Sequence, residues 1–195
     1  VSPVDAGQRT MAQLYPAQMS GTVTAVDDVS RPAKEGTTRM WPTAQWGSQL
    51  IDLNRVWPGD EQGGNPPTRH AGMVFNRLFK PNADYALDFH TAATGGDWTA
   101  FIFAKMGQPE IRAMALLYPI EQIKSDPGFP GTLETSLVKA GIPSLTIEIG
   151  GPRYFDKRMI PLFVEGTINV LKHHKLLDGA MGRTSKDSGV YFGDA

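Results

Sequence analysis

The clearest strand pattern in the chain is Pro143-Ser144-Leu145-Thr146-Ile147-Glu148-Ile149-Gly150-Gly151, a β-branched and apolar run closed by two glycines. Similar runs cover residues 85–90 and 98–103, and β-branched side chains alternate over residues 21–26. Helix-start signals and apolar residues at helical spacing separate these runs. We predict helices over residues 2–15, 67–79, 109–117, 131–140 and 155–177.

This alternation of strands and helices predicts an α/β fold, a three-layer sandwich around a mixed, mostly parallel sheet. A length of 195 residues fits a single domain, which we expect over residues 1–177. Residues 178–195 carry few apolar side chains, so we expect a loose C-terminal segment there. Because ligands of such sheets collect at the carboxyl ends of strands, polar residues at those ends are the first candidates for function.

Composition excludes several classes of protein. The 41% hydrophobic residues can form a core, so the chain is not disordered as a whole. Its 19 Lys and Arg residues nearly balance 20 Asp and Glu residues without a basic tract, so nucleic acid is not an expected partner.

No apolar run reaches the roughly 18–20 residues that span a bilayer. We expect a soluble, cytoplasmic protein, although nothing in the sequence identifies a compartment. With no cysteine, any metal must bind through His, Asp or Glu.

His90 ends one predicted strand, and Asp88 points to the same face because strand side chains alternate with a period of two. A carboxylate beside an imidazole can fix the tautomer of a histidine that binds metal or transfers protons. The alternative is a partly buried histidine whose hydrogen bonds are satisfied within the fold.

Glu148 lies inside the most apolar predicted strand, where a charge is costly unless it is paired or belongs to a site. A glutamate at a crevice suits a general base that activates water. The alternative is an edge strand on which Glu148 faces solvent.

Arg55 stands in Asp52-Leu53-Asn54-Arg55-Val56-Trp57-Pro58-Gly59, just before a Pro-Gly turn that could hold its guanidinium rigidly. Such a group can bind a carboxylate through two parallel hydrogen bonds. Arg39 lies upstream, in a long polar stretch over residues 31–47 that we expect to be a loop. Each arginine could instead be an ordinary surface residue.

The remaining histidines are weaker candidates. His70 lies on a predicted apolar helix, and His173 and His174 are adjacent near a helix end, where they point about 100° apart and make a poor chelating pair. We interpret all three as structural. The Gly95-Gly96 and Gly150-Gly151 pairs lack the spacing of a phosphate-binding loop.

Three motifs together carry a resemblance: residues 52–59, Asp88-Phe89-His90-Thr91 and Ile147-Glu148-Ile149-Gly150. In order and spacing they resemble the succinylglutamate desuccinylase/aspartoacylase family, which belongs with the zinc carboxypeptidase-like hydrolases. The resemblance extends over about residues 1–177, and it implies a zinc carboxypeptidase-like catalytic domain there.

The resemblance implies a zinc-dependent amidohydrolase that removes an acyl group from an N-acyl amino acid or a similar small, carboxylate-bearing amide. It implies that His90 binds the zinc, one ion per complete site, and that Glu148 activates the zinc-bound water. Asn54 and Arg55 match an Asn-Arg pair that holds substrate. Arg39, in Thr38-Arg39, matches an upstream arginine with the same task. Asp88 would support His90.

The sequence departs from this family in three ways. The resemblance implies that an early His-x-x-Glu motif supplies two of the three zinc ligands. No such motif occurs before Asp52, so we expect the chain to be an incomplete, inactive fragment without its N-terminal strand. The stretch between Arg39 and Asn54 is longer than the family pattern, and family members continue into a β-rich C-terminal region. A missing strand would expose an unpaired edge, so we expect copies to associate.

Two other functions remain open from the residues. One is a zinc carboxypeptidase acting on peptides, since an arginine can hold a terminal carboxylate in either substrate. The other is a metal-free domain that binds a carboxylate through Asn54 and Arg55.

Overall fold

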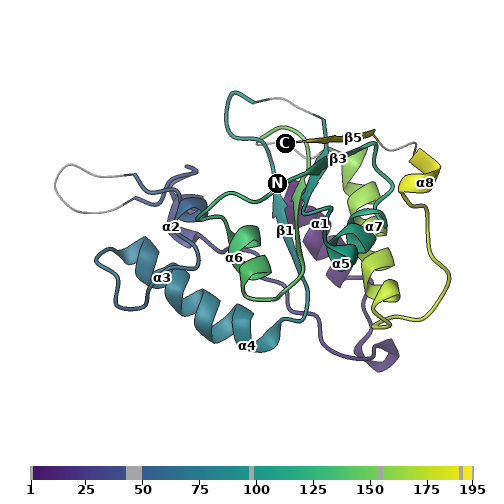
Figure 1. The fold of residues 1–195 in the computed structure, drawn as a ribbon, viewed down its shortest axis with the longest axis horizontal. Coiled ribbons are helices and arrows are strands. Elements are labelled where there is room, and N and C mark those ends of the chain that lie inside the picture. The colour runs from purple at the N-terminus through teal and green to yellow at the C-terminus, as the bar shows by residue number, and fades with distance from the viewer. Residues whose placement is uncertain (1, 43–49, 97–98, 153–155, 189–190, 195) are drawn as a thin grey trace. The chain divides into compact units, whose positions relative to one another are not determined.

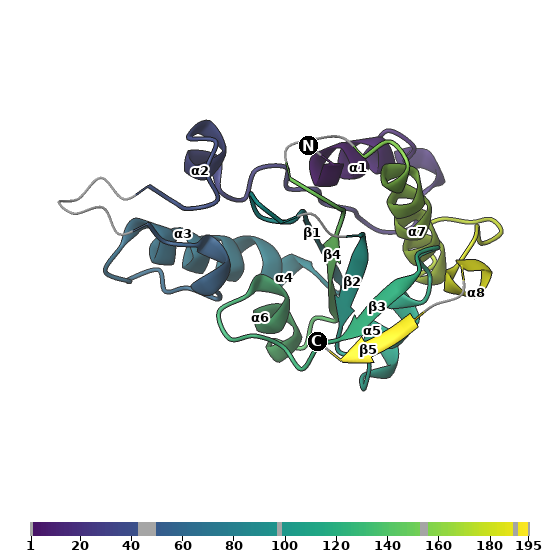
Figure 2. The ribbon, with the colours of Figure 1, turned by 90° about the horizontal axis from the view of Figure 1, so that it is seen from above.

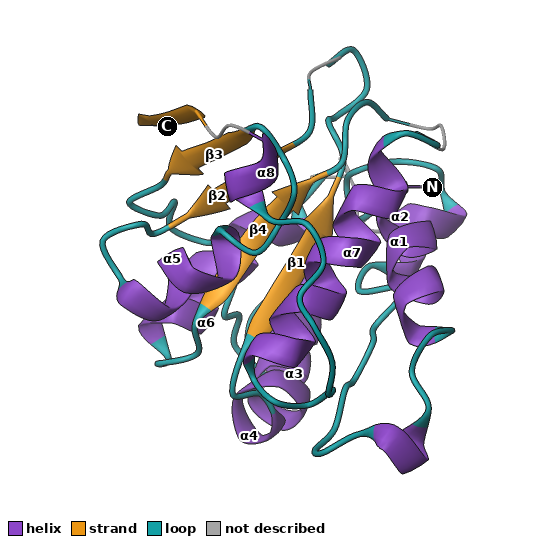
Figure 3. Ribbon diagram, turned by 90° about the vertical axis from the view of Figure 1, so that its right-hand side faces the viewer, coloured by secondary structure: helices purple, strands orange, loops and turns teal. Residues whose placement is uncertain are grey.

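The computed structural model of the chain describes residues 2–42, 50–96, 99–152, 156–188 and 191–194. Within these residues, five strands form one sheet in the order β1-β4-β2-β3-β5 (Figure 3). The strands are β1 (Ala86–His90), β2 (Phe101–Ala104), β3 (Gln122–Ser125), β4 (Ser144–Glu148) and β5 (Tyr191–Asp194).

The sheet is mixed and mostly parallel. β3 pairs in parallel with both β2 and β5, whereas β2 and β4 are antiparallel, with Ile102 opposite Ile147. β1 lies beside β4, and the Ile149 N–H donates to the His90 carbonyl oxygen at 2.8 Å. The predicted α/β fold with a mixed, mostly parallel sheet flanked by helices is confirmed.

The chain divides into two compact units. Unit 1 comprises residues 1–27, 89–127 and 145–195, and unit 2 comprises residues 28–88 and 128–144. The domain boundary expected at residue 177 stays a prediction.

Unit 1 contains the helices α1 (Ser2–Met11), α5 (Pro109–Ala115), α7 (Met159–His173) and α8 (Ser185–Ser188), and the 3-10 helix η1 (Pro16–Gln18). α1 packs along α7 (Figures 1 and 2). Ala6 and Thr10, one turn apart, are the buried side chains of α1. The apolar buried side chains of α7 are Ile160, Phe163, Val164, Val170 and Leu171.

The interior of unit 1 packs closely around Gly166 of α7. A Cβ atom at this position would lie 2.1 Å from Cδ1 of Tyr118, so only glycine admits the Tyr118 ring here. The Tyr118 hydroxyl lies 3.1 Å from Oγ1 of Thr167, and complete burial raises the pKa of this phenol.

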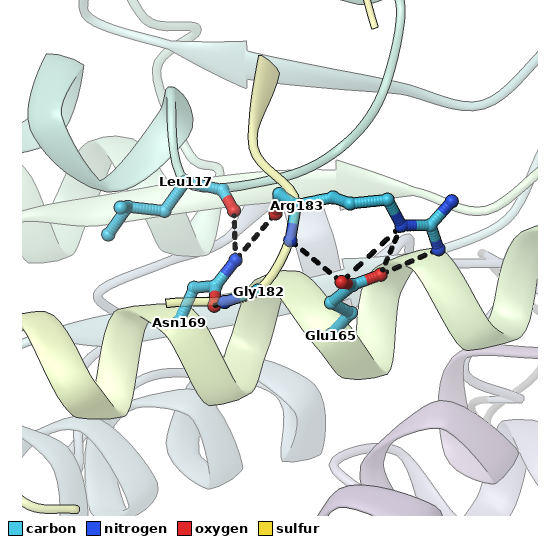
Figure 4. A network of polar contacts seen from close by, with 5 residues as sticks. All are labelled: Leu117, Glu165, Asn169, Gly182 and Arg183. Atoms are coloured by element: carbon cyan, nitrogen blue, oxygen red, sulfur yellow. Dashed lines mark hydrogen bonds and ion pairs between the residues drawn. The ribbon is translucent and has the colours of Figure 1, made fainter. Parts of the chain in front are cut away.

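The segment after α7 is tied to that helix by polar contacts (Figure 4). The buried Asn169 amide donates to the carbonyl oxygens of Leu117 (3.0 Å) and Arg183 (2.7 Å) and accepts from Gly182 N–H (2.7 Å). Arg183 also donates from its backbone and guanidinium to the Glu165 carboxylate. Residues 182 and 183 therefore have a fixed place on α7.

Unit 2 contains helices α2 (Arg31–Glu35), α3 (Pro66–Val74), α4 (Lys80–Asn82) and α6 (Leu133–Lys139), the 3-10 helix η2 (Leu53–Arg55) and the π-helical turn η3 (Phe75–Phe79). Its core combines η2, α3 and α6. The buried members of that cluster are Trp41, Leu53, Trp57, Ala71, Phe75, Leu133, Leu137 and Ile142.

Some local predictions were wrong. Residues 21–26 form no strand: they are mostly exposed, and β-branched side chains make a strand only where a neighbouring strand pairs with them. The helix from residue 67 does not end before Pro81. The Lys80 N–H donates to the Phe75 carbonyl, and Pro81 then sits in the first turn of α4, where no N–H is needed. The expected loop over residues 31–47 begins with α2, and its residues 43–47 lie outside the described part.

Candidate functional site

Asp52 organises the turn that contains the predicted substrate-binding residues of unit 2. One oxygen of its carboxylate, Oδ1, accepts the Asn54 N–H at 2.9 Å, and the other, Oδ2, accepts Nε of Arg39 at 2.9 Å. Nη1 of Arg55 lies 3.9 Å from Oδ2. The Asp52 side chain is only 14% exposed, whereas those of Arg39 and Arg55 are 40% and 48% exposed. One largely buried carboxylate thus lies beside two guanidinium groups that still reach solvent.

Asn54 connects this turn to α6. Its side-chain Oδ1 accepts the Leu133 N–H at 2.8 Å, so it caps one of the free N–H groups at the start of that helix. The Asn54 backbone carbonyl accepts Nη1 of Arg55 at 2.7 Å. Asn54 therefore fixes the turn on one side and the Arg55 guanidinium on the other.

The loop before α6 lies directly against Arg55. The guanidinium carbon of Arg55 is 5.0 Å from the centre of the Phe129 ring, and Phe129 is 57% exposed. Gly131 has φ +87°, and a Cβ atom there would lie 2.4 Å from the Arg55 carbonyl oxygen. The Gly131 carbonyl accepts the Trp57 N–H at 3.0 Å. Only glycine allows the two backbones to approach this closely.

His90 and Glu148 end neighbouring strands in unit 1. The Ile149 N–H bond to the His90 carbonyl brings the ends of β1 and β4 together. In a parallel ladder of this register, the His90 and Glu148 side chains lie on the same face. Leu145, Ile147 and Ile149 are fully buried on the other face of β4. Nε2 of His90 and Oε2 of Glu148 are both shielded from solvent.

The described residues do not by themselves fit a zinc ion. They contain no cluster of three His, Asp or Glu side chains that could hold a metal, and catalytic zinc sites use about three protein ligands. His90 is one suitable donor at a strand end. Asp88 precedes it by two residues on β1.

The other histidines have structural surroundings. Nε2 of His70 lies 2.8 Å from the Val29 carbonyl oxygen, and the His70 ring packs on Trp41 at 4.9 Å. The rings of His173 and His174 are 4.9 Å apart, and burial together with the neighbouring His173 lowers the pKa of His174.

A separate cavity of about 440 Å³ lies in unit 1. Its lining comes from α1, the start of α7 and the residues just before α7: Asp5, Arg9, Lys157, Ile160 and Pro161. Asp5 and Arg9 are paired with each other at 2.5 Å. No predicted site residue lines this cavity.

Sequence reasoning singled out Asn54 and Arg55 but missed two residues of the same cluster. Asp52 was part of the quoted motif, and the Asx pattern two residues before Asn54 could have marked it as the organiser of the turn. Phe129 stands between prolines and glycines in residues 127–131, a loop signal that does not reveal which residue the ring contacts.

The α/β fold is similar to that of solved succinylglutamate desuccinylase/aspartoacylase structures. The model of the succinylglutamate desuccinylase/aspartoacylase catalytic domain matches residues 1–174, and the chain belongs to this family. No curated protein matches the chain.

Solved structures agree with this assignment. A succinylglutamate desuccinylase/aspartoacylase from Rhodobacter sphaeroides superposes with a TM-score of 0.81 at 24% identity, covering 98% of this chain and 57% of that one. A succinylglutamate desuccinylase from Silicibacter sp. TM1040 superposes with a TM-score of 0.77 at 26% identity, covering 92% of this chain and 54% of that one. The product-bound ectoine utilization protein EutE of Ruegeria pomeroyi superposes with a TM-score of 0.78 at 24% identity, covering 98% of this chain and 58% of that one. The chain therefore spans little more than half the length of these structures.

No helix in the described residues is long and apolar enough to cross a membrane. The expected association of copies stays a prediction, as does the cytoplasmic location.

Proposed function

We propose that this chain is the catalytic part of an amidohydrolase that removes an acyl group from an N-acyl amino acid or a similar small amide. Membership of the family supports hydrolysis of this kind. A homologous structure holds a bound product, which supports a small-molecule substrate.

The observation that carries the proposal is the arginine cluster at Asp52. A carboxylate ligand needs a cation whose position is fixed and whose donors reach solvent. Arg55 fits both needs, because Asn54 and Asp52 hold one edge of the guanidinium while about half of the side chain is exposed. Arg39, held by the same Asp52 oxygen, adds a second positive charge.

Glu148 is proposed as the general base. It would take a proton from water as the oxygen attacks the amide carbon, and would return a proton to the nitrogen as the C–N bond breaks. Its position at a strand end, with Oε2 shielded from solvent, supports this role.

His90 is proposed as one ligand of a zinc ion, with Asp88 orienting its ring. Zinc would supply polarisation of the amide carbonyl. Because the described residues do not complete a zinc site, the remaining ligands have to come from other residues.

The test is an assay of the intact protein, purified without added metal or chelator, on N-succinyl amino acids, N-acetyl amino acids and short peptides. Release of free amino acid from the acylated compounds, and its loss in Glu148→Gln, is the expected result. Cleavage of peptides alone would replace the proposal with a carboxypeptidase. Carboxylate binding without turnover, unchanged by chelator, would replace it with a metal-free binding domain.

Zinc content is measured on the same preparation by elemental mass spectrometry. We expect about one zinc per complete site and a clear loss in His90→Ala. His70→Ala is the matched control, because His70 contacts the Val29 carbonyl and Trp41 instead. Equal zinc in wild type and His90→Ala would refute the assignment of His90.

A further inference from the structure

Phe129 is an exposed aromatic ring in a loop that is otherwise rigid. The loop, residues 127–132, contains Pro127 and Pro130, which restrict φ. The Phe129 carbonyl accepts both the N–H (3.2 Å) and the hydroxyl (2.8 Å) of Thr132, which closes a turn immediately before α6.

The guanidinium carbon of Arg55 lies over the Phe129 ring, 5.0 Å from its centre. The Nη1 edge of that group is already used by the Asn54 carbonyl. Within the described residues, neither Nε nor Nη2 of Arg55 bonds to another group. The edge formed by these two nitrogens is therefore the one from which two parallel hydrogen bonds to a carboxylate can be donated.

Three contacts hold the backbone that follows Phe129 against the turn that carries Arg55. Gly131 lies against the Arg55 backbone, the Trp57 N–H donates to the Gly131 carbonyl, and Asn54 caps α6. The guanidinium thus has two neighbours that limit its movement, the Phe129 ring and the Asn54 carbonyl.

We infer that Phe129 is a positioning residue for carboxylate recognition: its ring holds the Arg55 guanidinium in the plane in which Nε and Nη2 bind a carboxylate. This inference rests on the proposed role of Arg55 but not on hydrolysis, because binding alone expresses it. A cation over an aromatic face at an exposed site contributes a modest interaction, equivalent to about two- to five-fold in affinity.

The experiment measures binding of N-acetyl amino acids, and of their methyl esters, to the intact protein by calorimetry. We expect Phe129→Leu to weaken binding of the free acids about two- to five-fold and to leave binding of the esters unchanged. Phe129→Tyr and Phe129→Trp keep the aromatic face and should retain wild-type affinity. If the protein hydrolyses these compounds, Phe129→Leu should raise KM and leave kcat nearly unchanged.

A double-mutant cycle separates positioning from general packing. In an Arg55→Gln background, Phe129→Leu should have no further effect on binding, since the ring acts through the guanidinium. Met73→Leu, at another partly exposed apolar residue of unit 2, is the control and should change nothing. Equal losses for acid and ester, equal effects in both backgrounds, or no binding of any free acid by wild type would overturn the inference. Binding without turnover would refute the proposed hydrolysis and leave the inference standing.

Discussion

The turn that carries Arg55 and the strand end that carries Glu148 hold their functional side chains by different means. At the turn, the Asp52 side chain and the Asn54 backbone carbonyl hold the neighbouring guanidinium groups, and Arg55 remains about half exposed. At the strand end, the backbone ladder and buried side chains such as Ile147 fix Glu148, and its Oε2 atom is shielded. Solvent contact suits capture of a charged ligand, whereas shielding suits proton transfer. The difference suggests that binding and chemistry can be altered separately.

The largest effect is expected at the strand end. Glu148→Gln keeps the shape of the side chain but removes its basicity, so kcat for the acylated substrate should fall by about 10²- to 10⁴-fold with little change in KM. Steady-state kinetics measure both constants. Glu61→Gln is the control, because Glu61 is a partly exposed partner of Arg77 in unit 2. A rise in KM with kcat unchanged would show that Glu148 acts in substrate binding and not as the general base.

The next effect is expected where the loop meets the turn. Gly131→Ala should destabilise the protein by about 2–4 kcal/mol, since it adds left-handed strain and a contact with the Arg55 carbonyl. Gly141→Ala has a similar φ, +85°, but its Cβ would meet nothing within 4 Å, so strain alone should cost about 1–2 kcal/mol. Urea unfolding compares the two variants. Equal costs would show that the close approach at Gly131 is not stabilising the turn.

Arg55→Lys tests capture of the carboxylate. A lysine keeps the charge but not the paired donors, so affinity should fall by about 1.5–3 kcal/mol, with KM rising more than kcat falls. Arg77→Lys, an arginine paired with Glu61 in the same unit, serves for comparison and should bind normally. An unchanged KM in Arg55→Lys would place carboxylate recognition elsewhere.

The smallest effect is expected at the start of α7. Burial alone would raise the pKa of Asp156, but hydrogen bonds from the N–H groups of Arg158 (3.0 Å) and Met159 (3.2 Å) hold it below its usual 3.8. The charged Asp156 carboxylate therefore stabilises the folded protein above pH 3.8, and this contribution is lost as the pH falls below 3.8. Asp156→Ala should cost about 1 kcal/mol at pH 7 and progressively less below pH 3.8.

Thermal unfolding at several pH values measures this trend, with the exposed Asp178→Ala as the comparison. A cost that does not depend on pH would mean that the charge of Asp156 plays no part in the cap.

Local sequence patterns predicted strands correctly where apolar and polar side chains alternate strongly, as in β4. They failed where pairing with a neighbouring strand determines whether a segment becomes a strand. β3 has a single buried apolar residue, Ile123, and becomes a strand because β2 and β5 flank it. Residues 21–26 have the better β propensity and form no strand. β5 lies in the C-terminal part for which the sequence indicated no regular element.

The residues of the candidate site likewise include some that the sequence could predict and some that it could not. The motif around Asn54 and Arg55 could be found from the sequence because its residues are contiguous. The bond from Arg39 to Asp52 and the contact of Phe129 with Arg55 join distant segments, and only the folded chain brings these together. The assigned roles of His90, Asp88 and Glu148 stay predictions.

The most direct test compares hydrolysis of N-acyl amino acids with hydrolysis of their methyl esters by wild type and Arg55→Lys. We expect wild type to prefer the free carboxylates by at least about tenfold in kcat/KM, and Arg55→Lys to lose most of that preference. Equal rates on acid and ester in wild type, or a preference that survives Arg55→Lys, would contradict the proposal that this turn captures the substrate carboxylate.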